Sequence, residues 1–342
     1  MTKLSQIVNN LTKNLTSRQK EFLEERFGVR DGQKKTLQEL GDRYNITRER
    51  VRQIESEGLK IAKENFKKGD AGKIAFVAKN HLEVVGGIQK EDNFIENLKH
   101  ILKDESLNKY QARLLFEISG QPFFSPENDD FHNFWYTDKS VLKKAGSFID
   151  KAGKTFSKSK EQLIFQNKAG EIMAGLISSA SLDDFSASNY LAVSKKFGIN
   201  PYNDFGLSEW EEINPKTARA KAYLVLKKHG KPLHFRDIAS TINKTGFNHK
   251  TVYPQTIHNE LIKDNRFVLV GRGIYALREQ GYYPGTAKEV IQKILKENGP
   301  LLQQEIIETI AKQRFLKENT ILLNLQNKKY FKRLPNGRYH IA

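Results

Sequence analysis

Four residues near the N-terminus carry side chains that can recognise the edges of DNA bases. They are Arg48, Glu49, Arg52 and Gln53. Arginine can bond guanine through two hydrogen bonds, glutamine can do the same with adenine, and glutamate can accept a hydrogen bond from cytosine. On an α-helix the four lie within roughly 140° of one another. The spacing predicts one helical face that contacts base pairs in a major groove, with a solvated charged surface as the alternative.

The segment around these residues has the pattern of two helices joined by a tight turn. Thr36 and Glu39 form a capping box that begins the first helix, and Thr47 can cap the second. Asn45 stands at the turn, where φ is usually positive, and Gly41 is small where the helices must approach closely. Apolar contacts between the helices are expected from Leu40, Tyr44, Ile46, Val51 and Ile54, with Ile61 further along the same buried face.

Four runs of residues give this segment a specific resemblance. They are Leu15-Thr16-Ser17-Arg18-Gln19, Glu25-Arg26-Phe27-Gly28, Thr36-Leu37-Gln38-Glu39-Leu40-Gly41 and Thr47-Arg48-Glu49-Arg50-Val51-Arg52-Gln53-Ile54-Glu55. Together they resemble region 4 of the sigma-70 family, which binds the −35 promoter element and docks on the flap of RNA polymerase. The resemblance implies that Arg48, Glu49, Arg52 and Gln53 face bases. It implies that Arg18, Thr36 and Leu37 touch the DNA backbone, where we also expect Thr47 and Arg50.

Two departures from the family pattern stand further along the second helix. Glu57 replaces the usual Lys, and Gly58 replaces a helix-favouring Ala at a cost of about 1 kcal/mol in a helix interior. A carboxylate near the DNA phosphates weakens affinity for DNA, so we expect the preference for the −35 sequence to differ from that of the family. Fourteen residues precede Leu15, too few for a promoter-melting region, so we do not expect a complete initiation factor.

The composition agrees with a polyanionic partner. The chain has 342 residues, enough for two or three domains, and a formal net charge of +17. Such an excess attracts nucleic acid through a long-range field that salt weakens. The absence of cysteine excludes disulfides, thiolate metal sites and cysteine nucleophiles. No signal peptide or membrane span is evident, so we expect a cytoplasmic, nucleoid-associated protein.

The C-terminal third contains an internal repeat, residues 214–283 and 284–342. After the first helix, Gly230-Lys231-Pro232 of the first copy corresponds to Gly299-Pro300 of the second. An apolar second helix, an apolar third helix and a strand-turn-strand pattern also recur. Gly271-Arg272-Gly273 supplies the turn in the first copy, and Asn336-Gly337 supplies it in the second. Each copy therefore predicts three helices followed by a β-hairpin, which is a winged helix.

The first copy also has a family resemblance. Lys231-Pro232-Leu233-His234-Phe235-Arg236-Asp237-Ile238-Ala239 and Arg266 through Glu279 resemble a HARE-type helix-turn-helix, a family that includes the N-terminal domain of the RNA polymerase delta subunit. That domain contacts polymerase, so DNA and polymerase remain alternative partners here. We expect the third helix to begin at Tyr253-Pro254. Its exposed candidates are Tyr253, Gln255, His258 and Asn259, with Arg272 at the wing tip. In the second copy Lys329 and Arg333, with Lys328, Lys332 and Arg338, form a phosphate-binding wing.

Residues 73–213 are predicted as helices separated by aromatic-rich loops such as Gln121–Pro126, with no assigned role. Phe131, Phe134, Trp135 and Tyr136 are interpreted as core. His234 and His258 lack ligand neighbours, and the pairs Asp183-Asp184 and Asp129-Asp130 lack the spaced acid and Lys of a nuclease. We therefore expect no enzyme activity, no metal and no cofactor.

The sequence as a whole predicts a mainly α protein of four parts. These are a sigma region 4-like domain (1–68), a helical middle (73–213), a HARE-type winged helix (214–283) and a second winged helix (284–342). The expected function is a sequence-specific transcription regulator or an accessory factor of RNA polymerase core, acting on double-stranded DNA and not on membranes. An architectural nucleoid protein and the DNA-targeting subunit of a restriction system are the alternatives.

Overall fold

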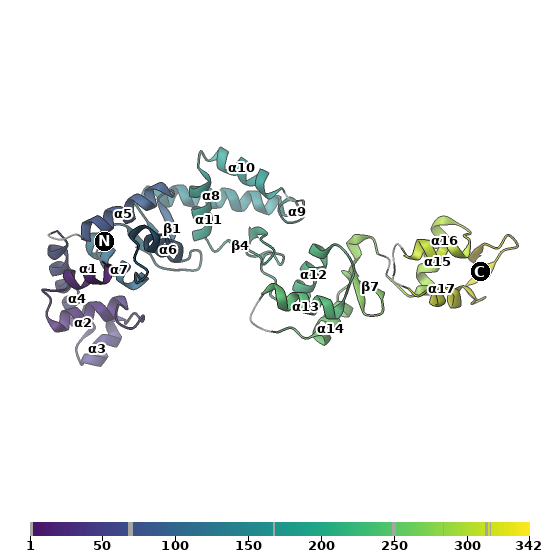
Figure 1. Ribbon diagram of the computed structural model, residues 1–342, viewed down its shortest axis with the longest axis horizontal. Helices are drawn as coiled ribbons and strands as arrows, with labels where there is room; N and C mark the ends of the chain where they lie inside the picture. Colours follow the sequence, from purple (N-terminus) through teal and green to yellow (C-terminus); the bar gives the residue numbers. More distant parts are fainter. Residues whose placement is uncertain are drawn as a thin grey trace. The chain divides into compact units, whose positions relative to one another are not determined.

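The structure is a computed structural model that describes residues 3–67, 71–166, 168–247, 251–282, 284–311, 314 and 316–342. The chain forms two compact units, Met1–Phe197 and Gly198–Ala342 (Figure 1). It is mainly helical, with small antiparallel strand pairs, as predicted. Of residues 69–72, which separate the first two predicted parts, 69 and 70 lie outside the described residues, and Ala71 and Gly72 begin helix α5 (Ala71–Val84).

The first unit begins with four helices whose ends follow from local side-chain chemistry. They are α1 (Leu4–Leu11), α2 (Ser17–Phe27), α3 (Leu37–Tyr44) and α4 (Arg48–Lys67). Thr16 and Gln19 form a capping box on α2, and Thr36 and Glu39 form the predicted one on α3. Gly28 ends α2 in the left-handed conformation that glycine tolerates best.

Two separate hydrophobic cores hold these helices. Phe22, Leu40, Val51 and Ile54 form a small cluster between α2, α3 and the first half of α4. A larger core joins α1, the second half of α4 and the following helices, from Leu4 to Trp135. A boundary at residue 68 therefore cuts through this larger core.

A layer of helices and a three-stranded sheet follow α4. The helices are α5, α6 (Glu91–Leu102) and α7 (Lys109–Ser119), and the antiparallel strand order is β1 (Ile88–Lys90), β3 (Phe134–Tyr136), β2 (Phe123–Ser125). The prediction of an aromatic-rich loop at Gln121–Pro126 is therefore wrong for Phe123–Ser125. Aromatic residues favour strands, and a strand of three residues is too short to show an alternating pattern. Phe134 and Trp135 are buried, which confirms their interpretation as core, whereas Phe131 and Tyr136 are only half-buried.

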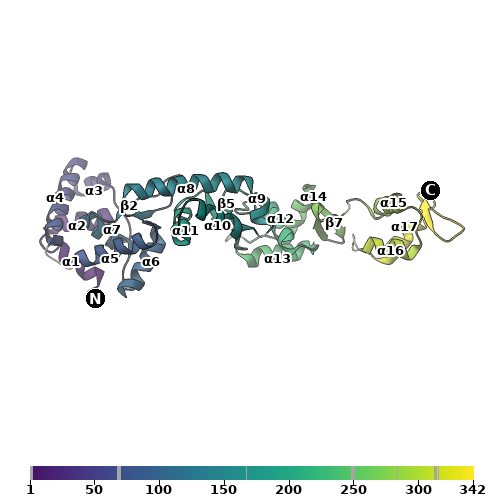
Figure 2. The same cartoon turned by 90° about the horizontal axis from the view of Figure 1, so that it is seen from above.

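The rest of the first unit is built on one long helix, α8 (Lys139–Lys158). Its neighbours are the helices α9 (Lys160–Ile164), α10 (Ala169–Ser179) and α11 (Asp184–Val193). Figures 1 and 2 both show α11 beside α8, and Phe148 of α8 meets Tyr190 of α11 edge to face. The short strands β4 (Phe197–Ile199) and β5 (Phe205–Leu207) pair after α11, where the second unit begins.

The second unit contains the predicted pair of winged helices. The first has α12 (Ala218–His229), α13 (Phe235–Thr245), α14 (Pro254–Lys263), β7 (Phe267–Gly271) and β8 (Ile274–Leu277), followed by the 3-10 turn η1 (Arg278–Gln280). The second has α15 (Ala287–Asn298), α16 (Gln303–Ala311), α17 (Glu318–Leu325), β9 (Phe331–Arg333) and β10 (Tyr339–Ile341). Each has its own hydrophobic core. Pro254 occupies the first turn of α14, as predicted.

The repeat extends to a strand that the sequence did not predict. In the first copy β6 (Leu233–His234) pairs with β8, so that Leu233 lies opposite Tyr275 and the sheet has three strands. In the second copy Leu301 forms an isolated bridge with Tyr339. The two bridges stand at aligned positions of the repeat, so the second copy has a single bridge where the first copy has its third strand.

Candidate nucleic-acid interface

The turn between α3 and α4 has the geometry that its residues predict. Asn45 adopts a φ of 50°, in the left-handed region. A Cβ atom on Gly41 would lie 2.7 Å from the Ile46 carbonyl oxygen, so this position excludes every larger residue. Thr47 Oγ1 accepts a hydrogen bond from the Arg50 amide at 3.1 Å and caps α4. These contacts fix the direction in which α4 leaves the turn.

The first turns of α4 separate a buried face from an exposed one. Val51 and Ile54 are buried, whereas Ile61, predicted on the same face, is only half-buried. The exposed side chains are the four predicted base readers, Arg48, Glu49, Arg52 and Gln53. The structure therefore places all four on one accessible surface.

Two pairs of side chains organise that exposed surface. Arg52 donates two hydrogen bonds to the Glu49 carboxylate, at 2.9 and 2.6 Å, and Arg50 Nη1 donates one to Gln53 Oε1 at 3.1 Å. The hydrogen bonds from Arg52 lower the pKa of Glu49, so the carboxylate is an acceptor at neutral pH. The surface therefore offers guanidinium donors and a carboxylate acceptor within one and a half turns of helix.

The predicted backbone contacts lie around this surface in different environments. Thr36 is exposed at the start of α3, whereas the Leu37 side chain packs against the small core, which leaves its main chain for any outside contact. The guanidinium carbon of Arg18 lies 5.6 Å from the centre of the Phe22 ring and stays exposed. Thr47 and Arg50 are exposed on α4.

The structure gives a reason for Gly58, one of the two departures from the family pattern. Gly58 is buried, and a Cβ atom there would lie 3.2 Å from Leu23 Cδ1. The glycine therefore allows α2 and α4 to approach closely. Glu57 is exposed and has no such packing role.

An ion pair between a buried carboxylate and an exposed arginine supports the domain and was not predicted. Glu25 is 4% exposed and accepts hydrogen bonds from Arg43 Nη1 at 2.6 and 2.8 Å. Because one partner comes from α2 and the other from α3, the pair fixes these helices to each other. No local sequence pattern links residues 18 positions apart in this way.

At helix α14 of the first winged helix, three of the four candidate contact residues are accessible. Tyr253 is 69% exposed, and Gln255 and Asn259 are exposed and hydrogen bonded to each other at 3.2 Å. The prediction that His258 is exposed is wrong, because the residue is half-buried. Its ring lies 4.7 Å from the ring of Phe235, because the helix turns this side chain toward the sheet.

The two wings carry exposed basic side chains. Arg272 is exposed in the turn between β7 and β8. Gly273 beside it has a φ of 72°, and a Cβ atom there would lie 2.5 Å from His234 Nε2, so the glycine is required. His234 caps α13 by accepting a hydrogen bond from the Arg236 amide, which is a structural role. On the second wing Lys329 and Arg333 are exposed.

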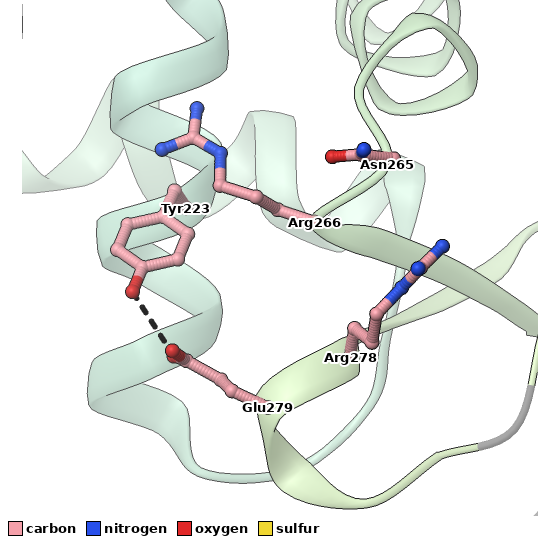
Figure 3. Close-up of a pocket in the computed structure, with 5 residues that line it drawn as sticks. All are labelled: Tyr223, Asn265, Arg266, Arg278 and Glu279. Carbon is pink, nitrogen blue, oxygen red and sulfur yellow. Dashed lines mark hydrogen bonds between the residues drawn. The ribbon is translucent and has the colours of Figure 1, made fainter.

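A small pocket lies on one side of the first winged helix (Figure 3). It has a volume of about 430 Å³ and is lined by Tyr223, Asn265, Arg266, Arg278 and Glu279. The Tyr223 hydroxyl donates to Glu279 at 3.0 Å, and Arg266 lies over the Tyr223 ring (Figure 3). Burial and the hydrogen bond to Glu279 raise the pKa of Tyr223, so its hydroxyl stays a donor. The contacts among Tyr223, Arg266 and Glu279 hold α12 to the end of the sheet.

The described residues contain neither a metal-binding cluster nor a membrane-spanning helix. No group of three or more His, Asp or Glu side chains there could hold a metal ion. Asp183 caps α11, and Asn128 accepts hydrogen bonds from the amides of Asp130 and Phe131 in a loop. No helix in the described ranges has the length and apolar character needed to cross a membrane.

A helix-turn-helix with an exposed polar reading face, followed by two basic winged helices, defines a protein of the DNA-binding class. Comparison with known families agrees. Residues 13–61 match the family described as "Sigma-70, region 4", and residues 216–280 match the HARE-HTH family, a helix-turn-helix domain described for ASXL and restriction endonuclease proteins. The chain therefore carries both domains that its sequence resembles, and these domains support a DNA-binding, transcription-related role.

Several sigma factors resemble the first of these domains. The "RNA polymerase sigma factor SigA" of Microcystis aeruginosa is 42% identical over 57 residues, which are 17% of this chain and 14% of that protein. The protein of the same name from Clostridium acetobutylicum is 50% identical over 46 residues, 14% of this chain and 12% of its own length. The sigB sigma factor of Arabidopsis thaliana is 42% identical over 60 residues, 18% and 10% of the two chains. The match spans at most 14% of these relatives.

Proposed function

We propose that this protein is a sequence-specific transcription regulator that reads promoter-like, −35-type DNA with α4. The observation that carries the proposal is the exposed set Arg48, Glu49, Arg52 and Gln53 on a helix capped and positioned by a helix-turn-helix. Side chains at the N-terminal end of such a helix meet base edges in the major groove. The chain has no catalytic role in this proposal and acts on DNA at the nucleoid in the cytoplasm.

Contacts to the DNA backbone complete the proposed interface. Arg18 and Arg50 supply cations beside α4, Thr36 and Thr47 supply hydroxyl groups, and Leu37 supplies its main-chain amide. Such groups set the register of the protein on the duplex and carry no sequence information. They would hold α4 in the groove while the base-reading side chains discriminate.

The test is a comparison of affinity for a selected site and for scrambled DNA. A regulator is expected to prefer its site by roughly 10³-fold or more at physiological salt. The full chain would first select its site from a randomised duplex library, and binding isotherms would then be measured on both DNAs. A preference of only a few fold would instead favour an architectural nucleoid protein.

We further propose that the chain associates with RNA polymerase core. The match to region 4 supports this, because region 4 occurs in the RNA polymerase sigma factors that the N-terminal domain resembles. The winged helices, with Tyr253, Gln255, Asn259 and Arg272 exposed, would contact either polymerase or DNA. Co-purification with core polymerase in the presence of a nuclease is the expected result. Loss of the polymerase on nuclease treatment would show that only DNA joined the two.

Replacing Lys329 and Arg333 by alanine is expected to weaken binding to every DNA sequence alike. The two exposed cations stand on the second wing, where phosphate contacts are proposed. Each lost phosphate contact reduces the slope of log affinity against log salt concentration by about 0.9. Isotherms at several salt concentrations measure this slope. An unchanged slope, or a loss confined to the selected site, would contradict the assignment.

The division into domains at 1–68, 73–213, 214–283 and 284–342 is also a proposal. The separate cores of the two winged helices support the last boundary. The core shared by α1, α4 and α5 to α7 suggests that the first two parts act as one folding unit.

A further inference from the structure

Helix α8, in the part of the chain with no assigned role, carries a row of lysines on one face. Lys143, Lys144, Lys151, Lys154 and Lys158 fall within an arc of about 100° around the helix axis. All five are exposed. From the first to the last, the row covers about 22 Å along the helix.

The opposite face of α8 fixes this row in place. Ala145, Phe148, Ile149, Ala152 and Phe156 are buried on that face. Phe148 packs against Tyr190, and Phe156 meets Phe197 edge to face at 5.5 Å between ring centres. Because the buried side holds the helix, the lysines form a defined surface and not a flexible basic tail.

A groove opens along the first half of the row. It has a volume of about 600 Å³ and lies between α8 and the turn after α10. Lys151 Nζ donates to Ser179 Oγ at 2.7 Å, which holds its ammonium at the edge of the groove. The groups that line it are mostly cations, hydroxyls and small apolar side chains: Lys143, Lys144, Ser147, Phe148, Lys151, Ala180, Ser181 and Leu182.

The charge of the row is not neutralised within the described part of the chain. Lys143, Lys144, Lys154 and Lys158 form no ion pair there. Asp150, the one carboxylate of α8, is paired with Lys196 at 3.1 Å. No acidic residue lines the groove. The surface therefore keeps a strong positive charge.

We propose that this face of α8 binds the phosphate backbone of duplex DNA, as a contact separate from the helix-turn-helix domains. The complementarity is one of charge and length, because about 22 Å of duplex carries about 13 phosphate charges. Lysine binds phosphate as a point charge, and serine hydroxyls can donate to the same oxygens. The first unit also contains α4, so DNA is the polyanion that this proposal, resting on the proposed function, assigns to α8.

The test replaces Lys143, Lys144 and Lys154 by glutamine in the full chain. Glutamine and lysine have similar helix propensities, so circular dichroism should not change. The salt slope is expected to fall by about 0.9 for each lysine that contacts a phosphate, about 2.7 in total, on selected and scrambled DNA alike. The matched control replaces Lys13, Lys103 and Lys168 by glutamine, which are exposed and form no ion pair in the described part of the chain, so the same charge is removed elsewhere in the unit and the slope should change by less than one. Arginine at the three α8 positions should restore it.

Three outcomes separate the proposals. An equal decrease of the salt slope in the test and control variants would overturn the α8 contact, because the general electrostatic attraction between the protein and DNA would then explain the decrease. Unchanged DNA binding together with lost binding to phosphatidylserine vesicles would also overturn it, in favour of a membrane surface. If the slope falls as expected while the wild-type protein shows no preference for any site, the α8 contact stands and the proposed sequence-specific function fails.

Discussion

Replacing Val51 by aspartate is expected to unfold the helix-turn-helix and to abolish DNA binding. Val51 is fully buried in the small cluster with Phe22, Leu40 and Ile54, and the aspartate would find no partner among these apolar side chains. An unpaired charge in such a site is among the few single changes that cost about 4 kcal/mol or more. Thermal unfolding of the full chain by circular dichroism, with DNA binding measured in parallel, checks the expectation.

Ser56→Asp is the matched control for this change. It adds the same carboxylate to the same helix at an exposed position, so its effect on stability should stay within about 0.5 kcal/mol. The larger core of the unit is separate from the small cluster, so the Val51 variant should keep most of its helical signal. If both variants unfolded at the same temperature, the assignment of Val51 to the core would be wrong.

The features of the DNA-binding domain that could be predicted are local ones. The capping box at Thr36 and Glu39, the left-handed Asn45 and the small Gly41 each follow from the chemistry of residues within six positions of one another. The internal repeat predicted both hairpins, because turn glycines and alternating apolar residues act over short distances too. These signals need no knowledge of the tertiary structure.

The features that could not be predicted depend on distant contacts. The pair Glu25–Arg43 and the burial of Gly58 against Leu23 join residues that the sequence does not associate. The lysines of α8 recur at helical spacing and could have been noticed. Their meaning depended on knowing that the other face of α8 is buried, and this comes only from the fold.

The middle part of the chain also positions the DNA-binding domain. A Cβ atom on Gly28 would lie 3.0 Å from Tyr110 Cδ1, so α7 packs directly against the loop before α3. Behind Tyr110, Arg113 Nε donates to the buried Glu91 at 2.6 Å, which ties α7 to α6. The small helix-turn-helix core is thereby held from outside by contacts that a fragment ending at residue 68 would lack.

Replacing Arg52 by alanine is expected to lower affinity for the selected site by about 1–3 kcal/mol, or roughly 5- to 150-fold. The loss has two sources. A bidentate contact to a base disappears, and Glu49 loses the guanidinium that now holds it and is left as an unpaired carboxylate facing the duplex. Gln53→Ala should cost a similar amount at a neighbouring base pair, and it would release Arg50. Isotherms on the selected site and on its single-base variants measure both effects.

The informative quantity in this experiment is the ratio of the affinities for the selected site and for its single-base variants. Affinity alone is not informative, because any lost cation weakens binding to all DNA. Lys63→Ala provides the control. It removes one positive charge from an exposed position of α4 about three turns beyond Arg52, where base edges are out of reach of the helix N-terminus. We expect Lys63→Ala to weaken both DNAs equally and Arg52→Ala to flatten the preference at one base pair. If the two variants behaved alike, α4 would hold the duplex without reading it, and the resemblance to sigma region 4 would describe a surface that docks on polymerase.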